Sequence, residues 1–255
     1  MINRIKGTQD IAFEDIEYWQ YIEQAVRNIT FRYAYNEIRT PIFEATELFK
    51  RSVGESTDVV QKEMYTFDDK GGRSITLRPE GTASVARAFI ENSFINLGSP
   101  VKLFYMGPMF RYEKPQAGRL RQFHQFGAEI LGSASAMADF EIIELACEFL
   151  KEVKINKTKL FINSIGCPSC RARYKEALRE YFRDKVDGMC EDCRRRFDSN
   201  VLRLLDCKID REQSENAPNI LEYLDEECRK HFEDLKWYLE KSGIDYEIDP
   251  HLVRG

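Results

Sequence analysis

Two loop motifs that commonly hold nucleotide phosphates are absent from this sequence. Neither a GxxxxGK[ST] loop nor a GxGxxG loop occurs in its 255 residues, and there is no internal repeat or low-complexity tract. These motifs bind phosphate through main-chain amides at the start of a helix. If this chain binds ATP, it must therefore do so with other groups.

Long apolar runs are also missing. None approaches the ~20 residues that a membrane helix needs, and residues 1–15 lack the apolar segment of a secretory signal. Seven cysteines, an odd number without an export signal, indicate reduced thiols. We therefore expect a cytoplasmic protein without a membrane partner.

The chain has no net positive charge, and histidine is scarce. The formal net charge is −5, so any nucleic-acid contact must come from local basic patches rather than from a general positive field. With only three histidines in the chain, an imidazole-based mechanism has little to draw on. We assign His124 no catalytic role.

Residues 104–129 are the most informative stretch that is present. Two apolar-rich segments flank a turn at residues 114–118, which predicts a β-hairpin. Because strand side chains alternate between faces, one face collects Gly107, Met109, Arg111 and Glu113 with Arg121, Phe123, Gln125, Gly127 and Glu129. That face suits a ligand with phosphates, an amine and a flat ring. A solvated face with cross-strand ion pairs fits the pattern equally well.

The letters FRYEKPQAGRLRQFHQFGAE, residues 110–129, resemble motif 2 of class II aminoacyl-tRNA synthetases in the form typical of histidyl-tRNA synthetases. The resemblance covers nearly all of the chain. It implies an α+β fold, with an antiparallel sheet flanked by helices and a helical insertion. It also implies ATP-dependent activation of histidine to histidyl-adenylate and transfer to tRNA(His), with Mg²⁺ accompanying ATP.

A predicted helix over residues 14–33 precedes a predicted strand over residues 35–44. Pro41 lacks an N–H donor, so this strand should lie at an edge or an interface. The pair resembles motif 1, which in this family forms the homodimer interface. Taken alone, a helix followed by an edge strand is common.

A second hairpin is predicted over residues 63–78, followed by a helix from Thr82 to about residue 92. On its own, this pattern favours Thr82 as a simple helix cap. The letters LRPEGT resemble the family segment whose acid and threonine hold the α-amino group of histidine. The resemblance therefore places Glu80 and Thr82 in a histidine site.

A helix over residues 136–153 and a short strand over 159–163 lead to a change of composition at Gly166. We expect a catalytic core over 1–165, a helical insertion over 166–243 and a return to the core over 244–255. The insertion has predicted helices near 171–184 and 191–204 and is rich in basic residues. It resembles the family domain that reaches toward the tRNA acceptor arm, although most charge runs are solvated surfaces.

Four cysteines of the insertion have the spacing of a zinc site. Cys167, Cys170, Cys190 and Cys193 form two C-x2-C pairs separated by 19 residues. The family does not require zinc for its chemistry. The spacing therefore leaves two alternatives open, a closed structural Zn²⁺ site or four reduced thiols in a small core.

The last letters, LVRG, resemble the start of a second signature of histidyl-tRNA synthetases, and we expect the chain to be a catalytic-domain fragment. The resemblance makes Arg111 and Arg254 catalytic. It gives the ATP-binding residues as Arg111, Glu113, Arg119, Arg121 and Phe123, and the histidine-binding residues as Glu80, Thr82, Gln125 and Glu129.

Two other functions remain open from the sequence. A synthetase-like regulatory subunit of ATP phosphoribosyltransferase would bind histidine as a sensor but has no use for Arg111, Glu113 and Arg254. An RNA-binding module working through the insertion would leave Glu80 and Glu129 unexplained. The retained arginine set favours an enzyme origin.

Overall fold

The computed structural model describes residues 2–54, 57 and 59–253. The chain groups into two compact units. The first contains the residues up to 134 together with 141–156, and the second contains 135–140 together with the residues from 157 onward. Among the described ranges, no helix is both long and apolar enough to cross a membrane.

The first unit is built on the predicted hairpin. Strands β5 (Val101–Phe110) and β6 (Gln122–Leu131) pair antiparallel along their whole length, with Gly107 opposite Gln125. The connecting segment covers residues 111–121, which is longer than the predicted turn. Strand β1 (Asn36–Glu37) adds in parallel to β5.

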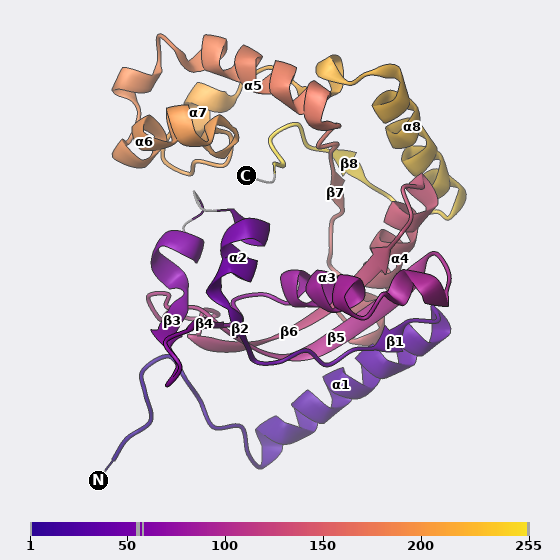
Figure 1. The fold of residues 1–255 in the computed structure, drawn as a ribbon. Coiled ribbons are helices and arrows are strands. Elements are labelled where there is room, and N and C mark those ends of the chain that lie inside the picture. The colour runs from indigo at the N-terminus through magenta and orange to yellow at the C-terminus, as the bar shows by residue number, and fades with distance from the viewer. Residues whose placement is uncertain (1, 55–56, 58, 254–255) are drawn as a thin grey trace. The chain divides into compact units, whose positions relative to one another are not determined.

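The two faces of this sheet are covered by different helices. Val26 and Ile29 of α1 (Glu14–Arg32) and Leu145 of α4 (Ala136–Glu152) pack with Phe104 on one face. On the other face, Val85 of α3 (Thr82–Glu91) packs with Tyr105 and other β5 residues. Helices α1 and α3 accordingly lie on opposite sides of the β5–β6 ribbon (Figure 1).

The strand predicted over residues 35–44 is wrong in one respect, because it is broken in two. Strand β1 joins β5, whereas β2 (Phe43–Ala45) pairs with β4 (Ser74–Leu77) in a separate sheet of order β2-β4-β3. Pro41 lies in the break and has no N–H to donate to a ladder. The predicted second hairpin is confirmed as β3 (Tyr65–Asp68) and β4.

Short helices connect these strands. Helix α2 (Thr46–Val53) follows β2, a π-helical turn covers Val59–Glu63, and a 3-10 turn covers Phe94–Leu97. The predicted helix at Thr82 is confirmed as α3.

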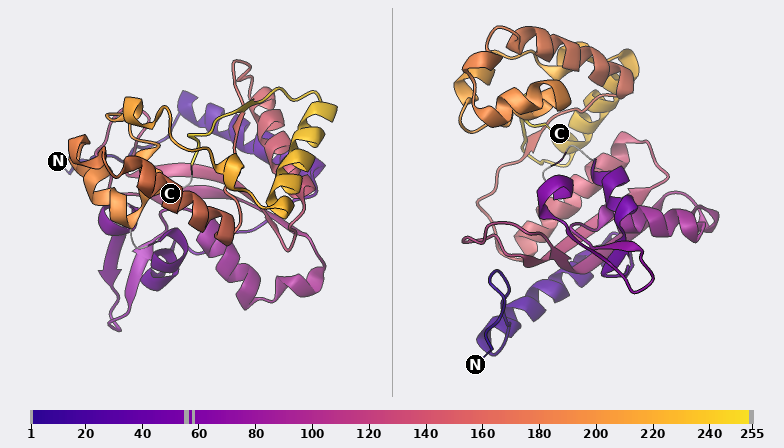
Figure 2. Two further views of the ribbon diagram at one scale, coloured as in Figure 1. Left: turned by 90° about the horizontal axis from the view of Figure 1, so that it is seen from above. Right: turned by 60° about the vertical axis from the view of Figure 1, so that its left-hand side comes forward.

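The second unit is mainly helical. It contains α5 (Pro168–Phe182), α6 (Glu191–Ser199), α7 (Arg211–Ser214) and α8 (Glu226–Lys241), with 3-10 turns at Val186–Gly188, Val201–Leu204 and Ile220–Tyr223. Both views in Figure 2 show α5, α6 and α7 gathered together. The large buried side chains of this unit include Tyr174, Leu178, Phe182, Leu204 and Leu239.

One of the helix predictions in this unit needs correction. The helix predicted over 191–204 ends at Ser199, and a separate 3-10 turn covers Val201–Leu204. Strands β7 (Phe161–Ile162) and β8 (Glu247–Ile248) pair in parallel and group with these helices. The predicted domain bounds at 166 and 243 stay a prediction.

Candidate functional site

The start of α3 is held by Glu80 rather than by Thr82. The Glu80 carboxylate accepts hydrogen bonds from the main-chain N–H of Thr82 at 2.7 Å and of Ala83 at 3.0 Å. The Thr82 hydroxyl instead donates to Glu129 of β6 at 2.7 Å. The simple reading of Thr82 as a helix cap is therefore wrong. Its side chain joins α3 to the polar face of the hairpin.

Tyr105 lies directly behind this hydrogen bond. Its side chain is hydrogen-bonded to Thr82, and burial raises the pKa of its phenol to about 12, so it stays neutral. A Cβ added at Gly81 or at Gly127 would lie 2.2 Å from the Tyr105 ring. The two glycines therefore create the slot that the ring fills.

Tyr105 and Gly81 are parts of this site that were not predicted from the sequence. The available signal was weak, because a glycine in a strand can mark a bulge or a close approach of another group. Which ring approaches Gly127 depends on the tertiary fold.

Gln125 offers an amide oxygen to this face without a protein partner. Its Oε1 is buried and accepts no hydrogen bond from the described residues. It lies opposite Gly107 in the hairpin register, where there is no cross-strand side chain. An unpaired buried acceptor is costly. A bound ligand with an N–H group would satisfy it.

The buried Arg78 supports strand β5. Its guanidinium donates to the main-chain oxygens of Pro108 at 2.9 Å and Thr40 at 3.0 Å, and a Cβ at Gly107 would lie 2.8 Å from it. Burial lowers the pKa of Arg78 from its ordinary value, and the charge of Glu44 acts in the opposite direction. Gly107 therefore makes room for a buried cation beneath the polar face.

A second group of predicted residues gathers where the hairpin strands end. Arg111 Nε donates to the Pro79 carbonyl at 2.9 Å, and its guanidinium lies 5.3 Å from the centre of the Phe123 ring. The Glu113 carboxylate forms an ion pair with the Arg119 guanidinium at 3.1 Å. Its other oxygen lies 3.9 Å from the Arg111 guanidinium. The structure thus brings two cations, a carboxylate and an aromatic ring together.

Arg121 has different neighbours. Its guanidinium lies 4.0 Å from the centre of the Tyr112 ring and donates to the Glu113 carbonyl at 3.2 Å. Its main-chain N–H donates to Gly7 at 2.7 Å. Arg121 therefore has a visible structural role in tying the N-terminal segment to the hairpin. The predicted ATP contact of Arg121 stays a prediction.

His124 is on the opposite face of β6. Its ring packs against Trp19 of α1, with 4.5 Å between ring centres. Desolvation by its neighbours lowers the pKa of His124, with the charge of Glu23 acting in the opposite direction. The ring thus makes an edge contact with α1, and the expectation that His124 has no catalytic role stays a prediction.

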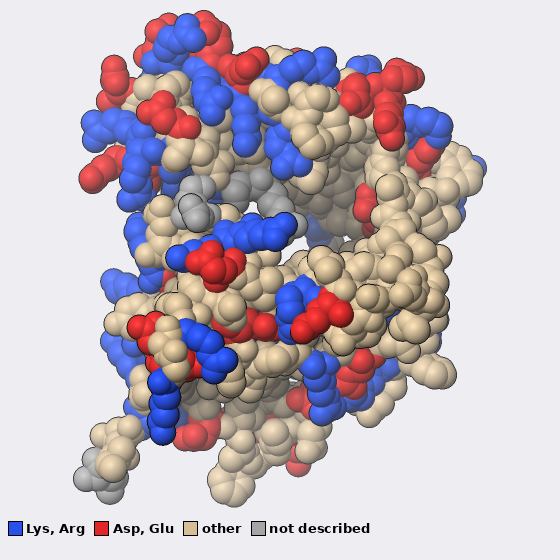
Figure 3. All heavy atoms as spheres, viewed as in Figure 1, with Lys and Arg blue, Asp and Glu red and all other residues tan. Residues whose placement is uncertain are grey.

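The helical unit carries charges of both signs. Several of its arginines have acidic or carbonyl partners, such as Arg195 with Asp192 at 2.7 Å and Arg173 with the Tyr223 carbonyl at 2.8 Å. Figure 3 shows Lys and Arg atoms interspersed with Asp and Glu atoms over α5, α6 and α7. The face in view has no continuous basic patch.

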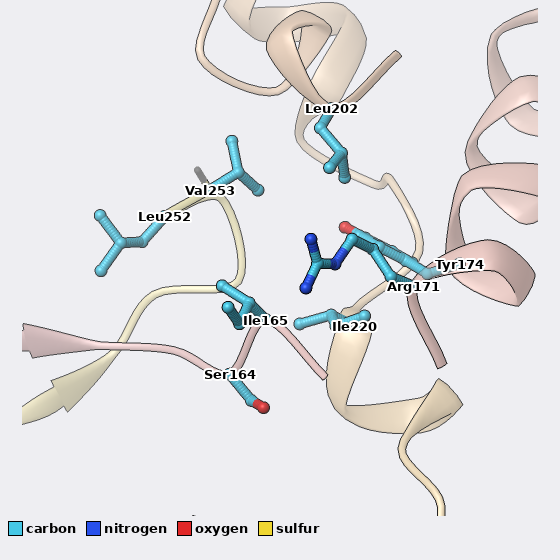
Figure 4. Close-up of a pocket in the computed structure, with 8 residues that line it drawn as sticks. All are labelled: Ser164, Ile165, Arg171, Tyr174, Leu202, Ile220, Leu252 and Val253. Atoms are coloured by element: carbon cyan, nitrogen blue, oxygen red, sulfur yellow. The ribbon is translucent and has the colours of Figure 1, made fainter. Parts of the chain in front are cut away.

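A small, mostly apolar pocket also lies within the second unit (Figure 4). It is lined by Ser164, Ile165, Arg171, Tyr174, Leu202, Ile220, Leu252 and Val253, with the Arg171 guanidinium pointing into its middle. None of the predicted ATP- or histidine-binding residues lines it. The predicted catalytic Arg254 follows Val253 and lies outside the described residues.

The four cysteines of the C-x2-C spacing are divided between two separate clusters. Cys167 and Cys170 lie with Asp225 and Cys228, whereas Cys190 and Cys193 lie with Cys207 and Asp210. Each C-x2-C pair precedes or opens a different helix, α5 or α6. The 15 residues of α5 span about 22 Å at 1.5 Å per residue. This helix carries the chain away from Cys167 before Cys190 is reached.

The comparisons with known proteins agree with this fold. A solved structure of apo histidyl-tRNA synthetase from S. aureus superposes with a TM-score of 0.79 at 41% identity, covering 100% of this chain and 58% of that one. A B. halodurans structure titled as an ATP phosphoribosyltransferase regulatory subunit/histidyl-tRNA synthetase gives a TM-score of 0.71 at 22% identity, covering 99% and 69%. The first unit therefore has the catalytic fold of a class II aminoacyl-tRNA synthetase.

The sequence comparisons narrow the class to a family. The family model described as histidyl-tRNA synthetase matches residues 7–255, so the chain belongs to the histidyl-tRNA synthetase family. A histidine–tRNA ligase of Thermosipho melanesiensis is 61% identical over all 255 residues of this chain, which cover 61% of that protein. The chain thus spans about three fifths of the length of that curated relative.

Proposed function

We propose that this chain supplies the histidine- and ATP-binding part of a cytoplasmic histidine–tRNA ligase. The observation that carries the proposal is the junction of Thr82 with Glu129, beside the unpaired buried oxygen of Gln125. Two carboxylates, a hydroxyl and an amide oxygen are acceptors suited to an ammonium group. Glu80 retains this capacity while capping α3, because each carboxylate oxygen has more than one lone pair.

The ligase reaction has two steps in this proposal. The histidine carboxylate attacks the α-phosphorus of ATP and releases pyrophosphate. A hydroxyl of the 3′-terminal ribose of tRNA(His) then takes the histidyl group from the adenylate, and AMP leaves. The site must bring two anions together and stabilise charge on a pentacoordinate phosphorus. Positioning and fixed positive charge dominate such chemistry.

Each residue of the site is assigned a role from its position. Arg111 is assigned to the α-phosphate, because its Nε is fixed by the Pro79 carbonyl while the rest of the guanidinium remains available to a ligand. Glu113 is assigned to the adenine amino group, with the ring stacked on Phe123. Arg119 and Arg121 address the outer phosphates or the tRNA end. Mg²⁺ accompanies ATP, and Arg254 is assigned to the side of the phosphate opposite Arg111.

The larger partners belong to the same proposal. A homodimer through the motif 1 region is supported by apolar and aromatic residues of α1 that the single chain leaves exposed, among them Ile16, Tyr18, Tyr21 and Ile22. The helical unit is assigned to the tRNA acceptor arm, through exposed arginines such as Arg194. Zinc has no part in the chemistry.

The second candidate is a histidine-binding regulatory subunit. The B. halodurans structure is similar to this chain in fold alone, so it leaves this candidate open. A sensor needs the ammonium-binding set but not the group of Arg111, Glu113 and Phe123. The geometry of that group favours the ligase, since two cations and an aromatic ring beside a carboxylate match an adenine nucleotide.

Calorimetric titration with L-histidine and with ATP–Mg²⁺, performed separately on the whole chain, distinguishes the two candidates. The ligase proposal expects saturable binding of both ligands. Binding of histidine with no detectable heat from ATP–Mg²⁺ would favour the regulatory subunit, and binding of neither ligand would contradict both.

A further inference from the structure

We propose that the helical unit binds two zinc ions, each held by three cysteine thiolates and one aspartate. The first cluster consists of Cys167, Cys170, Asp225 and Cys228. The second cluster consists of Cys190, Cys193, Cys207 and Asp210. Six of the seven cysteines of the chain belong to these clusters, and Cys147 of α4 is the one left outside.

The spacing of the ligand atoms fits a single ion in each cluster. Within each cluster, one ligand atom of every residue lies within 4.8 Å of the others. Tetrahedral Zn–S bonds of about 2.3 Å place neighbouring sulfurs about 3.8 Å apart. The Cys190 and Cys207 sulfurs are 3.8 Å apart, and those of Cys167 and Cys170 are 3.4 Å apart. Thiolate ligands select zinc over magnesium or calcium.

Both clusters are built on one plan. Each joins a C-x2-C pair to a second pair with the same spacing, D-x2-C at residues 225–228 and C-x2-D at residues 207–210. In the first cluster, Cys167 is the N-cap of α5 and Asp225 is the N-cap of α8. The structure therefore reveals two partner pairs that the cysteine spacing alone did not indicate.

Main-chain amides point at the sulfurs of the first cluster. The N–H of Asp225 donates to Cys170 Sγ at 3.1 Å, and the N–H of Cys167 donates to Cys228 Sγ at 3.3 Å. The Arg173 guanidinium lies 3.8 Å from Cys170 Sγ. Such donors favour the charged thiolate, which is the form that binds a metal.

The second cluster has a similar arrangement. The N–H of Asp210 lies 3.5 Å from Cys207 Sγ, and Asp210 Oδ2 accepts from the N–H of Cys190 at 3.0 Å. Cys193 is fully buried, as is Cys170 in the first cluster. A helix cap needs only one side-chain acceptor and one main-chain N–H. Capping therefore does not explain why four ligand atoms lie together in each cluster.

The two sites would act as nested cross-links. The first joins residues 167–170 to 225–228, and the second joins residues 190–193 to 207–210 within that loop. A small helical unit gains much from such links, because its own core is limited. Four protein ligands also close each site, which gives the metal a structural role.

The test is the zinc content of the full chain, purified under reducing conditions without chelator and measured by plasma mass spectrometry. The proposal expects two zinc ions per chain in the parent protein. Cys193→Ala should lower the content to one by disabling the second cluster. Cys147→Ala is the matched control and should leave it at two.

A second variant separates ligation from capping. Asn replaces Asp well as a helix N-cap but brings no negative charge to a metal. Asp225→Asn should therefore keep the helical circular dichroism of the chain. Its zinc affinity, measured by competition with increasing concentrations of a chelator, should fall at least about tenfold, as is typical when a group that supports a metal site is lost. X-ray absorption at the zinc edge should report mainly sulfur neighbours near 2.3 Å.

Three results would overturn the proposal. Less than about one zinc per five chains, at concentrations where structural sites are normally saturated, would exclude both sites. Equal zinc loss in Cys147→Ala and Cys193→Ala would show adventitious binding. Recovery of the six cluster cysteines as disulfides under the same reducing conditions would replace the metal by a redox pairing.

Discussion

Arg111 has a fixed position, and its positive charge is only weakly neutralised by the protein. One of its nitrogens is held by the Pro79 carbonyl, while its contact with Glu113 is long, at 3.9 Å. A guanidinium oriented by the protein in this way can meet a phosphate without first reorganising. The assigned role in ATP binding therefore rests on a side chain whose position the protein fixes.

We expect Arg111→Ala to weaken binding of ATP–Mg²⁺ to the chain by about tenfold or more, the usual effect of losing a hydrogen bond to a charged group. Isothermal titration calorimetry measures this. Arg32→Ala is the control, because Arg32 lies outside the site and makes an exposed ion pair with Glu152. An affinity that stays equal in both variants would remove Arg111 from the site.

Gly127 tests the packing beneath the same face. An added Cβ would lie 2.2 Å from the Tyr105 ring, which is 4% exposed and unable to move aside freely. We expect Gly127→Ala to lower the free energy of unfolding by about 1–3 kcal/mol, the range for overpacked cores. Urea unfolding followed by circular dichroism gives the value.

Gly188→Ala is the matched comparison for that measurement. A Cβ at Gly188 would meet no atom within 4 Å. Its effect should stay within about 0.5 kcal/mol, as for ordinary surface substitutions. Similar effects at the two glycines would mean that Tyr105 does not fill the slot described here.

Single residues also mark where sequence reasoning succeeds and fails. Alternation along a strand was enough to place Gln125 and Glu129 on one face, because the period of a strand is fixed. It could not tell whether Glu80 or Thr82 caps α3, since that depends on the loop geometry before the helix. The partners of the C-x2-C pairs were missed because they come from contacts across tens of residues.

Helix α1 supports the hairpin from the face opposite the polar site. Its apolar stripe is uneven, because Ile29 is fully buried whereas Ile16 is 38% exposed. The buried end packs against Phe104 of β5 and Tyr35. The polar face can therefore keep its geometry only if this part of α1 stays in place.

We expect Ile29→Ala to lower the free energy of unfolding by about 2–5 kcal/mol, because it leaves a cavity in the core. Phe31→Ala, in the same helix but at a side chain that is 85% exposed, should cost less than about 1 kcal/mol, since it covers little apolar area and alanine favours the helix. Chemical denaturation of the two variants side by side tests this. Equal losses would contradict the packing assigned to α1.

Elements with strong periodicity were predicted well. The first helix, both hairpins and α3 match their predicted residues closely, since each has a repeating apolar pattern or a turn with specific residues. The segment 35–44 was predicted as one strand although it serves two sheets. The sequence shows Pro41 there but not which strand each half will meet.

At the scale of the whole chain, one unit carries the proposed chemistry and the other carries the cysteine clusters. The resemblance in motif 2 identified the family that the family model also matches over residues 7–255. The roles of individual residues follow from geometry rather than from that match. The central claim is that Glu129, Thr82 and Gln125 recognise the ammonium group of histidine.

The most direct test compares L-histidine with 3-(imidazol-4-yl)propanoate, which lacks only the amino group, by calorimetric titration of the whole chain. We expect histidine to bind at least about tenfold more tightly, because ion pairs and charged hydrogen bonds to the ammonium are lost with the analogue. Glu129→Gln should remove most of that difference, whereas Glu152→Gln, outside the site, should preserve it. Equal binding of the two ligands to the parent chain, or an unchanged preference in Glu129→Gln, would contradict the account.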